Sequence, residues 1–266
     1  MKRRLYSRLL LGTALALMLA LPTRAARRSI PVQVDAAVLP GGSYVEGSIT
    51  YAPFRALLYA LNDGWAVWWD GEAGQAAAQA DSTHLRADPV ADTVTVNGHV
   101  LTGRVTVENG VTYVPLRLLC EALGCTVEWD AYLGGAAVTT PGAGYDASEL
   151  YWLSRLIYAE SGAEPLAGQI AVGNVVLNRV ASEQFPDTVQ AVIFDRKDAV
   201  QFEPVANGTV YAPPSAQSVE AAKRALDGEN VIGSALYFYA PALSQGTWIN
   251  ANRVYSQTIG CHRFYV

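Results

Sequence analysis

Between residues 50 and 130 the sequence repeats itself, and this repeat constrains the fold more than any other feature. One copy begins Tyr51-Ala-Pro53-Phe-Arg55 and the other begins Tyr113-Val-Pro115-Leu-Arg117. Each copy continues through an Ala-Leu segment to a Trp-Asp pair, at residues 69–70 and 129–130. A proline is tolerated in the first turn of a helix, because its missing N–H would have no partner there. We therefore expect each copy to form a strand, a short helix and a second strand.

Two segments between the copies predict β-hairpins. Residues 92–98 and 104–110 alternate valine with polar residues, and both end in Asn-Gly. That dipeptide favours the two-residue turns of hairpins, since both of its residues accept a positive φ. The N-terminal part is therefore expected to be a small mixed α/β module made of two repeats.

The Tyr-x-Pro-x-Arg, Ala-Leu and Trp-Asp pattern resembles the copper amine oxidase N-terminal-like (stalk) domain, which implies a domain over residues 26–140. Copper sites are built from clustered His, Cys or Met side chains. His84 and His99 have no His, Cys or Met residues close to them in the sequence. We therefore expect no metal and no cofactor. The module is interpreted as a spacer or a wall-facing adhesion module. A folding or dimerisation scaffold is the alternative.

The first 25 residues predict a secretory signal peptide. A basic start is followed by an apolar run from Leu9 to Leu21 and by small residues ending at Ala25, which is typical of export signals. The run is shorter than the ~20 apolar residues that span a bilayer. We expect cleavage after Ala25, no stable membrane span and a secreted protein. An uncleaved, membrane-tethered form is the alternative.

Charge and cysteine content exclude two classes of protein. Without residues 1–25, the chain keeps 14 basic residues against 24 acidic ones. Nucleic-acid binding requires a basic face, so nucleic acid is not expected as a partner. Three cysteines do not make a disulfide framework. Cys120 and Cys125 are expected either to form a local bridge or to act as small buried hydrophobes.

A short linker, residues 141–146, precedes a second domain that we expect over residues 147–266. Asp146 followed three residues later by Glu149 is typical of a capped helix start. The helix is expected to end near Glu160, where a turn begins.

The turn passes through Gly162, and a second helix is expected from Pro165 to about Val180. This second helix is apolar on nearly all sides, which places it at the centre of its domain. Among its polar residues, Asn174 and Arg179 are interpreted as members of a core hydrogen-bond network.

Glu160 and Glu164 lie four residues apart on the two sides of the predicted turn. A helix C-terminus disfavours negative charge and a helix N-terminus favours it. Environments that separate the pKa values of two carboxyls assign acid and base roles. Glu160 is therefore a candidate general acid, and Glu164 is interpreted as a charged residue that supports the site.

The end of the chain is rich in aromatic residues, including Tyr237, Tyr239 and Trp248. Aromatic faces with polar tips suit sugar rings, although a packed aromatic core is the ordinary alternative. No Gly-x-Ser-x-Gly nucleophile elbow occurs. Cys261 and His262 are adjacent, and neighbours on a strand point to opposite faces. A thiol-protease dyad is therefore not expected.

Several motifs occur in order along this second domain: Ala159-Glu160-Ser-Gly-Ala-Glu164-Pro, Gly168-Gln169, Val176-Leu177-Asn178-Arg179, Phe185-Pro186, Gln201-Phe202, Ala235-Leu-Tyr237-Phe-Tyr239, Trp248, and Ile259-Gly260 through Phe264-Tyr265. Together they resemble the catalytic core of the spore cortex-lytic and cell wall hydrolase family. The resemblance implies a lysozyme-like α+β domain that cleaves peptidoglycan glycan strands, with Glu160 as the catalytic residue. The candidate substrate-binding residues are Glu164, Gln169, Asn178, Gln201, Phe202, Tyr237, Tyr239, Trp248 and His262.

The predicted function is a secreted enzyme that cuts between N-acetylmuramic acid and N-acetylglucosamine. The resemblance implies lytic transglycosylation, with Glu160 acting first as acid and then as base, and with peptidoglycan as the partner. It also implies a location in the cell wall or the spore envelope. A hydrolytic muramidase or glucosaminidase, which needs a second carboxylate, is one alternative. A non-catalytic wall-binding protein is the other.

Overall fold

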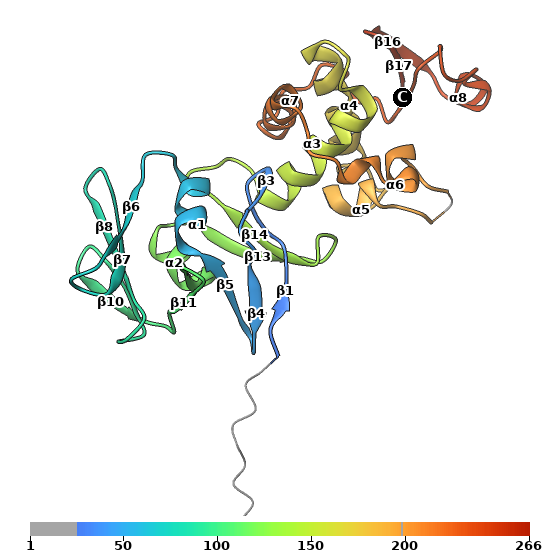
Figure 1. Cartoon of the computed structure of the whole chain (residues 1–266). Helices are drawn as coiled ribbons and strands as arrows, with labels where there is room; N and C mark the ends of the chain where they lie inside the picture. Colours follow the sequence, from blue (N-terminus) through green and yellow to red (C-terminus); the bar gives the residue numbers. More distant parts are fainter. Residues whose placement is uncertain (1–25, 198) are drawn as a thin grey trace, which may run out of the picture.

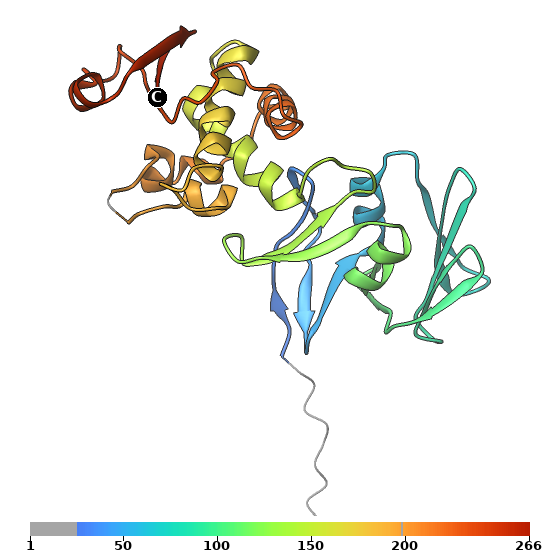
Figure 2. The ribbon, with the colours of Figure 1, turned by 180° about the vertical axis from the view of Figure 1, so that it is seen from behind.

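The computed structural model describes residues 26–197 and 199–266 (Figure 1). The predicted signal peptide, residues 1–25, lies outside the described residues. The described chain contains both helices and strands, and the α+β prediction is confirmed. A β-rich N-terminal module is followed by a mainly helical second part, as the two opposite views show (Figures 1 and 2).

Three sheets make up most of the N-terminal module. In order across the first sheet, the strands are β1 (Arg28–Ser29), β4 (Tyr44–Glu46), β5 (Ile49–Pro53), β12 (Val111–Pro115) and β11 (Thr106–Glu108). The second sheet contains β10 (His99–Thr102), β9 (Thr93–Val96), β8 (Thr83–Asp88), β7 (Gln75–Ala80) and β6 (Ala66–Asp70). The third contains β13 (Thr126–Asp130), β14 (Gly135–Thr139), β2 (Val32–Val34) and β3 (Ala37–Val38).

The two repeats fold in the predicted way and face each other across a pseudo-two-fold axis. Strand β5 leads into α1 (Phe54–Leu61) and then β6, while β12 leads into α2 (Leu116–Ala122) and then β13. Strands β5 and β12 pair antiparallel, with Ala52 opposite Val114. Those two residues hold the same position in the two repeats, so the axis passes between them. Each helix therefore packs against the first strands of both repeats.

Both predicted Asn-Gly hairpins are present. Strands β9 and β10 are joined at Asn97-Gly98, with φ values of 49° and 86°. Strands β11 and β12 are joined at Asn109-Gly110, with φ values of 49° and 79°. Positive φ at both central residues matches the twist of the flanking strands, which is why this dipeptide fixes the register there.

Apolar residues of both helices meet in one core between the sheets. Leu57 and Leu58 of α1 and Leu119 of α2 are fully buried there. Cys120 and Cys125 are buried in the same core as free thiols. The description as small buried hydrophobes therefore fits this pair in the structure.

The second part begins with α3 (Ala147–Ser161), followed by α4 (Leu166–Val180). The remaining elements are α5 (Val189–Ile193), α6 (Glu203–Asn207), the 3₁₀ helix η1 (Thr209–Tyr211), α7 (Ala216–Leu226), β15 (Tyr237–Tyr239), α8 (Thr247–Asn252), β16 (Tyr255–Ile259) and β17 (His262–Tyr265). The last three strands form a sheet in the order β15-β17-β16. Helix α4 packs against both α3 and α7, which confirms its predicted central position.

The start of α3 is defined by a side-chain cap. The Asp146 carboxylate accepts hydrogen bonds from the N–H groups of Ser148 and Glu149. These donors have no partner inside the helix, so the cap fixes where α3 begins. The linker over residues 141–146 stays a prediction. Just before it, the hydroxyl of Thr139 at the end of β14 accepts a hydrogen bond from the Ala147 N–H.

Helix α3 also ties the second part to the N-terminal module. The buried Asp130 carboxylate, at the end of β13, accepts hydrogen bonds from the Ser148 hydroxyl and, at 2.8 Å, from the Trp152 indole N–H. The Arg155 guanidinium donates to the Ala36 carbonyl at 3.0 Å. A buried carboxylate with two donors from the neighbouring part makes this contact specific.

No helix within residues 26–197 and 199–266 combines the length and apolar character needed to cross a membrane.

Candidate active site

Glu160 occupies the last turn of α3, and the chain then turns through Gly162 into α4. Its carboxyl is only partly exposed. Burial and, to a smaller extent, the nearby Glu203 carboxylate raise the pKa of Glu160, the Arg179 guanidinium lowers it, and the net result is a pKa of about 7. A carboxyl with that pKa can hold a proton and release it near neutral pH, which is what a general acid–base residue needs.

The sequence had suggested the helix C-terminus as the reason for a raised pKa. In the structure the first cause is removal of the carboxyl from water. Burial disfavours the charged form of an acid whatever its position in a helix.

Two adjoining cavities meet at Glu160. The first, of about 340 Å³, is an aromatic pocket between α4, β15 and α8. The second, of about 790 Å³, is a more open groove along the α3–α4 turn and α6. Glu160, Glu203 and Leu243 line both. The two cavities therefore form one continuous groove, with two carboxyls near its middle.

Most of the predicted site residues come together in the aromatic pocket. Those that line it besides Glu160 are Gln201, Phe202, Tyr237, Tyr239, Trp248 and His262. They come from the segment before α6, from β15, from α8 and from β17. Residues spaced over more than a hundred positions thus reach one cavity.

Trp248 and Tyr237 provide the aromatic wall of this pocket. Their ring centroids lie 6.1 Å apart, and the Arg253 guanidinium lies 4.4 Å from the Tyr237 ring. Trp248 belongs to the short helix α8 rather than to a loop, and it is 59% exposed. An exposed tryptophan beside a cavity offers a flat apolar face for a sugar ring.

Arg179 is a site residue that the sequence interpretation assigned to the core network. It does donate to the Leu236 carbonyl at 2.8 Å. Its guanidinium also lies 4.8 Å from the Phe185 ring and 5.1 Å from the Phe202 ring, and it lines the aromatic pocket. Burial lowers the pKa of Arg179 to about 10. It therefore places a positive charge where it favours the ionised form of Glu160.

Glu203 is the second residue that sequence reasoning missed. It is the first residue of α6, it is exposed, and it lines both cavities. The available signal was its position directly after Gln201-Phe202.

The Glu164 carboxylate makes a hydrogen bond to the backbone. Its carboxylate accepts the Cys261 N–H at 2.9 Å, which ties the α3–α4 turn to the β16–β17 hairpin. Gly260 makes this possible, because a Cβ there would overlap that carboxylate and the backbone has φ +58°. Glu164 also lines the open groove. A supporting role for Glu164 stays a prediction.

Two predicted substrate-binding residues make internal hydrogen bonds and line neither cavity. The Gln169 amide donates to the carbonyls of Gly162 and Glu164 and accepts from the Ser218 hydroxyl. The Asn178 amide donates to the carbonyls of Gly233 and Ala235. Both side chains therefore hold the backbone around the site.

His262 lines the aromatic pocket from β17. It is buried, its ring stands 5.3 Å from that of Phe238, and burial lowers its pKa. An uncharged imidazole in this position can contact a ligand through its ring and through a hydrogen bond, and it contributes no charge to the pocket.

A copper site does not fit the residues of the described chain. Nowhere in residues 26–197 and 199–266 do three or more His, Cys, Asp or Glu side chains gather as metal ligands. His84 and His99 lie on β8 and β10, and β9 separates these strands.

Comparisons with known proteins identify both parts of the chain. Residues 163–265 match the family described as Cell Wall Hydrolase, and residues 33–138 match the Copper amine oxidase N-terminal domain. The chain thus carries a cell wall hydrolase domain and a copper amine oxidase N-terminal domain, as the motifs predicted.

The curated relatives are spore cortex-lytic enzymes. That of Bacillus cereus is 37% identical over 121 residues, which is 46% of this chain and 45% of the relative. That of Bacillus subtilis is 34% identical over 128 residues, or 48% of this chain and 40% of the relative. The chain therefore spans less than half the length of these relatives.

Among solved structures, the catalytic domain of the germination-specific lytic transglycosylase SleB from Bacillus anthracis is similar. It is 36% identical, and the match covers 48% of this chain and all of that domain, with a TM-score of 0.43.

Proposed function

We propose that this chain degrades peptidoglycan by cleaving the glycan strand between N-acetylmuramic acid and N-acetylglucosamine, as a lytic transglycosylase. The observation that carries the proposal is Glu160, a carboxyl with a pKa of about 7 in the middle of a continuous groove. The groove extends to both sides of that carboxyl, so a polymer can lie across it with its scissile bond at Glu160. The cell wall hydrolase domain and the spore cortex-lytic relatives support peptidoglycan as that polymer.

In the first step, protonated Glu160 donates its proton to the glycosidic oxygen, and the bond from C1 of muramic acid to that oxygen breaks. Glu160, now ionised, accepts the proton of the C6 hydroxyl of the same muramic acid. The C6 oxygen attacks C1 and closes an anhydro ring. One carboxyl therefore serves as acid and then as base, and no water is consumed.

The surroundings of Glu160 suit both halves of this cycle. Burial and the Glu203 carboxylate favour the protonated carboxyl that starts the reaction. The Arg179 guanidinium favours the ionised carboxylate that follows proton transfer. Because these opposing influences leave the pKa of Glu160 at about 7, the carboxyl can lose and regain its proton without a large energetic cost in either direction.

The decisive variant is Glu160→Gln, which preserves shape and cannot donate a proton. It should not release fragments from purified peptidoglycan, whereas the wild type clears a suspension and yields products with anhydro-muramic ends by mass spectrometry. If neither protein clears the suspension, the chain is a wall-binding protein and the catalytic proposal fails.

Hydrolysis is the second candidate, and Glu203 is the observation that favours it. Two carboxyls that flank a scissile bond are the ordinary equipment of a glycosidase, the second activating water or attacking C1. In that case the products have reducing ends, and Glu203→Gln should lose activity nearly as completely as Glu160→Gln. Under transglycosylation, Glu203→Gln keeps most of its activity and changes only the pH dependence.

The proposed site of action is outside the cytoplasm, on wall or spore-cortex peptidoglycan, because the relatives are named for the cortex. The predicted signal peptide agrees with that location.

A further inference from the structure

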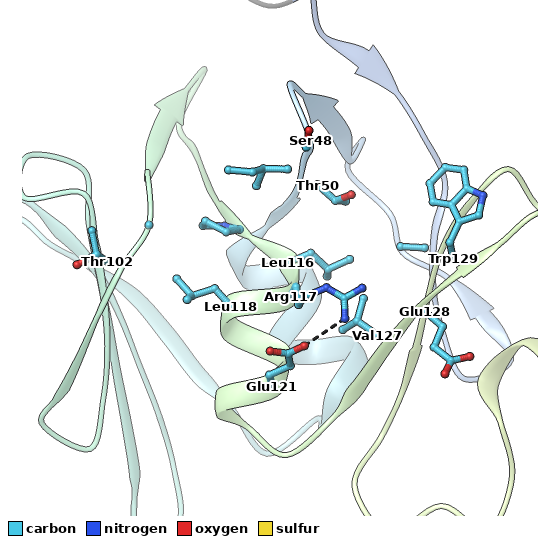
Figure 3. Close-up of a pocket in the computed structure, with 14 residues that line it drawn as sticks. Ser48, Thr50, Thr102, Leu116, Arg117, Leu118, Glu121, Val127, Glu128 and Trp129 are labelled. Carbon is cyan, nitrogen blue, oxygen red and sulfur yellow. Dashed lines mark hydrogen bonds and ion pairs between the residues drawn. The ribbon is translucent and has the colours of Figure 1, made fainter.

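Each repeat of the N-terminal module builds a groove beside an exposed tryptophan. We call them the Trp129 groove and the Trp69 groove, of about 490 and 370 Å³. In Figure 3 the start of α2, with Leu116 and Arg117, lies between β13 with Trp129 and the strand that carries Thr102. Neither groove is part of the candidate active site.

The two grooves are equivalents under the pseudo-two-fold axis. Each is lined by the Pro-x-Arg start of one helix, by the tryptophan strand of the same repeat and by the first strand of the other repeat. In the Trp129 groove these residues are Pro115, Leu116, Arg117, Val127, Trp129, Ile49 and Thr50. In the Trp69 groove they are Pro53, Phe54, Arg55, Val67, Trp69, Val111 and Thr112. The same surface therefore occurs twice.

The two tryptophans are about half exposed, so neither is a core residue of the module. Trp69 and Trp129 are 47% and 53% exposed, and each lies on β6 or β13, the edge strand of its sheet. Exposed edges are normally protected by charged residues, proline or short length, since an apolar edge invites aggregation. A large exposed apolar side chain at the same place in both repeats therefore points to binding.

Each groove also offers a guanidinium beside the tryptophan. Arg55 is exposed, and no described residue forms a hydrogen bond or ion pair with it. Arg117 pairs with Glu121 at 3.1 Å on the exposed face of α2 (Figure 3), which leaves donors and acceptors side by side in the groove. A flat aromatic ring with adjacent donors matches a sugar ring, which has C–H faces and oxygens at its rim.

We propose that the Trp69 and Trp129 grooves are two equivalent saccharide-binding sites for the amino-sugar glycan of peptidoglycan. The identity of the polymer rests on the function proposed above for the second domain. The tryptophan stacks on a sugar face, and the arginine donates to acetamido and carboxylate oxygens of the strand and its attached peptides. The Trp129 groove also carries Glu121, which pairs with Arg117, and Glu128. Recognition of the glycan therefore depends on ring stacking and hydrogen bonds rather than on net charge.

A repeating polymer suits a repeated site. When two sites engage one insoluble polymer, the second binding event gains effective concentration, and total affinity exceeds that of either site alone by roughly 10²–10⁴. Loss of one site should therefore weaken retention by at least about tenfold, and loss of both should weaken it further.

The test is co-sedimentation of the full chain with insoluble peptidoglycan, in a Glu160→Gln background so that the polymer is not digested. Trp69→Ala and Trp129→Ala are compared singly and together, with Trp→Phe as the conservative replacement. Arg28→Ala is the matched control, because Arg28 is an exposed arginine of the same module and lines neither groove. Circular dichroism checks that each variant is folded.

Weaker binding by each single variant, a larger loss in the double variant and retention by Trp→Phe would support the two sites. Unchanged binding by the double variant would overturn them. Loss of wild-type binding on peptide-stripped glycan would also overturn them, since the ligand would then be the peptide. Because binding is measured without catalysis, its outcome is separate from whether Glu160→Gln abolishes clearing.

Discussion

The state of Glu160 makes a prediction about stability that does not depend on any substrate. The pKa of an ordinary glutamate is 4.5, and that of Glu160 is about 7. In the unfolded chain Glu160 should therefore lose its proton more readily than in the folded protein. The protonated carboxyl stabilises the fold relative to the ionised one, so this contribution is present below about pH 4.5 and is lost as pH rises through 7.

The size of the effect follows from the two pKa values. One unit of pKa corresponds to 1.36 kcal/mol, so the rise from 4.5 to about 7 corresponds to at most about 3.4 kcal/mol. Partial exposure of the carboxyl to water reduces that figure. At pH 7 about half of the Glu160 carboxyls carry a proton, whereas an ordinary glutamate would be protonated in roughly 0.3% of molecules.

Glu160→Gln imitates the protonated side chain and cannot ionise. Urea denaturation at pH 4 should therefore give nearly the same free energy of unfolding for variant and wild type. At pH 8.5 the variant should be more stable, by up to about 3 kcal/mol. Glu183→Gln, at an exposed glutamate in the same domain, controls for the loss of a negative charge and should follow the wild type at both pH values. An equal difference at the two pH values would show that ionisation of Glu160 is not costly in the folded protein.

Three other changes test neighbouring features. Glu203→Gln removes a charge that raises the pKa of Glu160, so the alkaline limb of kcat/KM should move to lower pH, by up to about one unit; an unmoved limb would mean that the two carboxyls do not interact. Gly260→Ala should displace the Glu164 carboxylate from its backbone donor, the Cys261 N–H. The rate at which the protein clears a wall suspension should then fall by about tenfold or more. A thermal melt of the variant separates a local effect on the site from global unfolding. Asp130→Ala leaves two buried donors of α3 without an acceptor and should cost about 2–4 kcal/mol in urea denaturation; a cost below about 0.5 kcal/mol would show that the contact is replaced by water.

Local signals in the sequence predicted much of the fold. The duplicated Pro-x-Arg and Trp-Asp pattern gave both strand–helix–strand units, and two Asn-Gly pairs gave the hairpins. Asp146 gave the start of α3. These features depend on interactions within a few residues, so a sequence carries them directly.

The order of motifs along the second domain predicted most of the residues that line the pocket around Glu160. The role of Glu160 was inferred from its place at a helix end and from the family motifs, and it stays a prediction; burial rather than the helix end dominates its pKa. Arg179 and Glu203 were missed because their roles depend on folding α4 and α6 against α3. Asn178 has the polarity of a site residue, but its amide is used by the backbone around residue 233. Such competition between a ligand and the protein's own carbonyl groups is decided in three dimensions.

Helix α3 has one end clamped by Asp130 and the other end carrying Glu160. At 1.5 Å per residue, the stretch from Trp152 to Glu160 is a rigid strut of about 12 Å. If the N-terminal module binds the wall, α3 would therefore hold the Glu160 carboxyl at a constant distance from the bound polymer and in a constant orientation. Fragment lengths from an immobilised protein should then cluster around a preferred size, and breaking the clamp should broaden them.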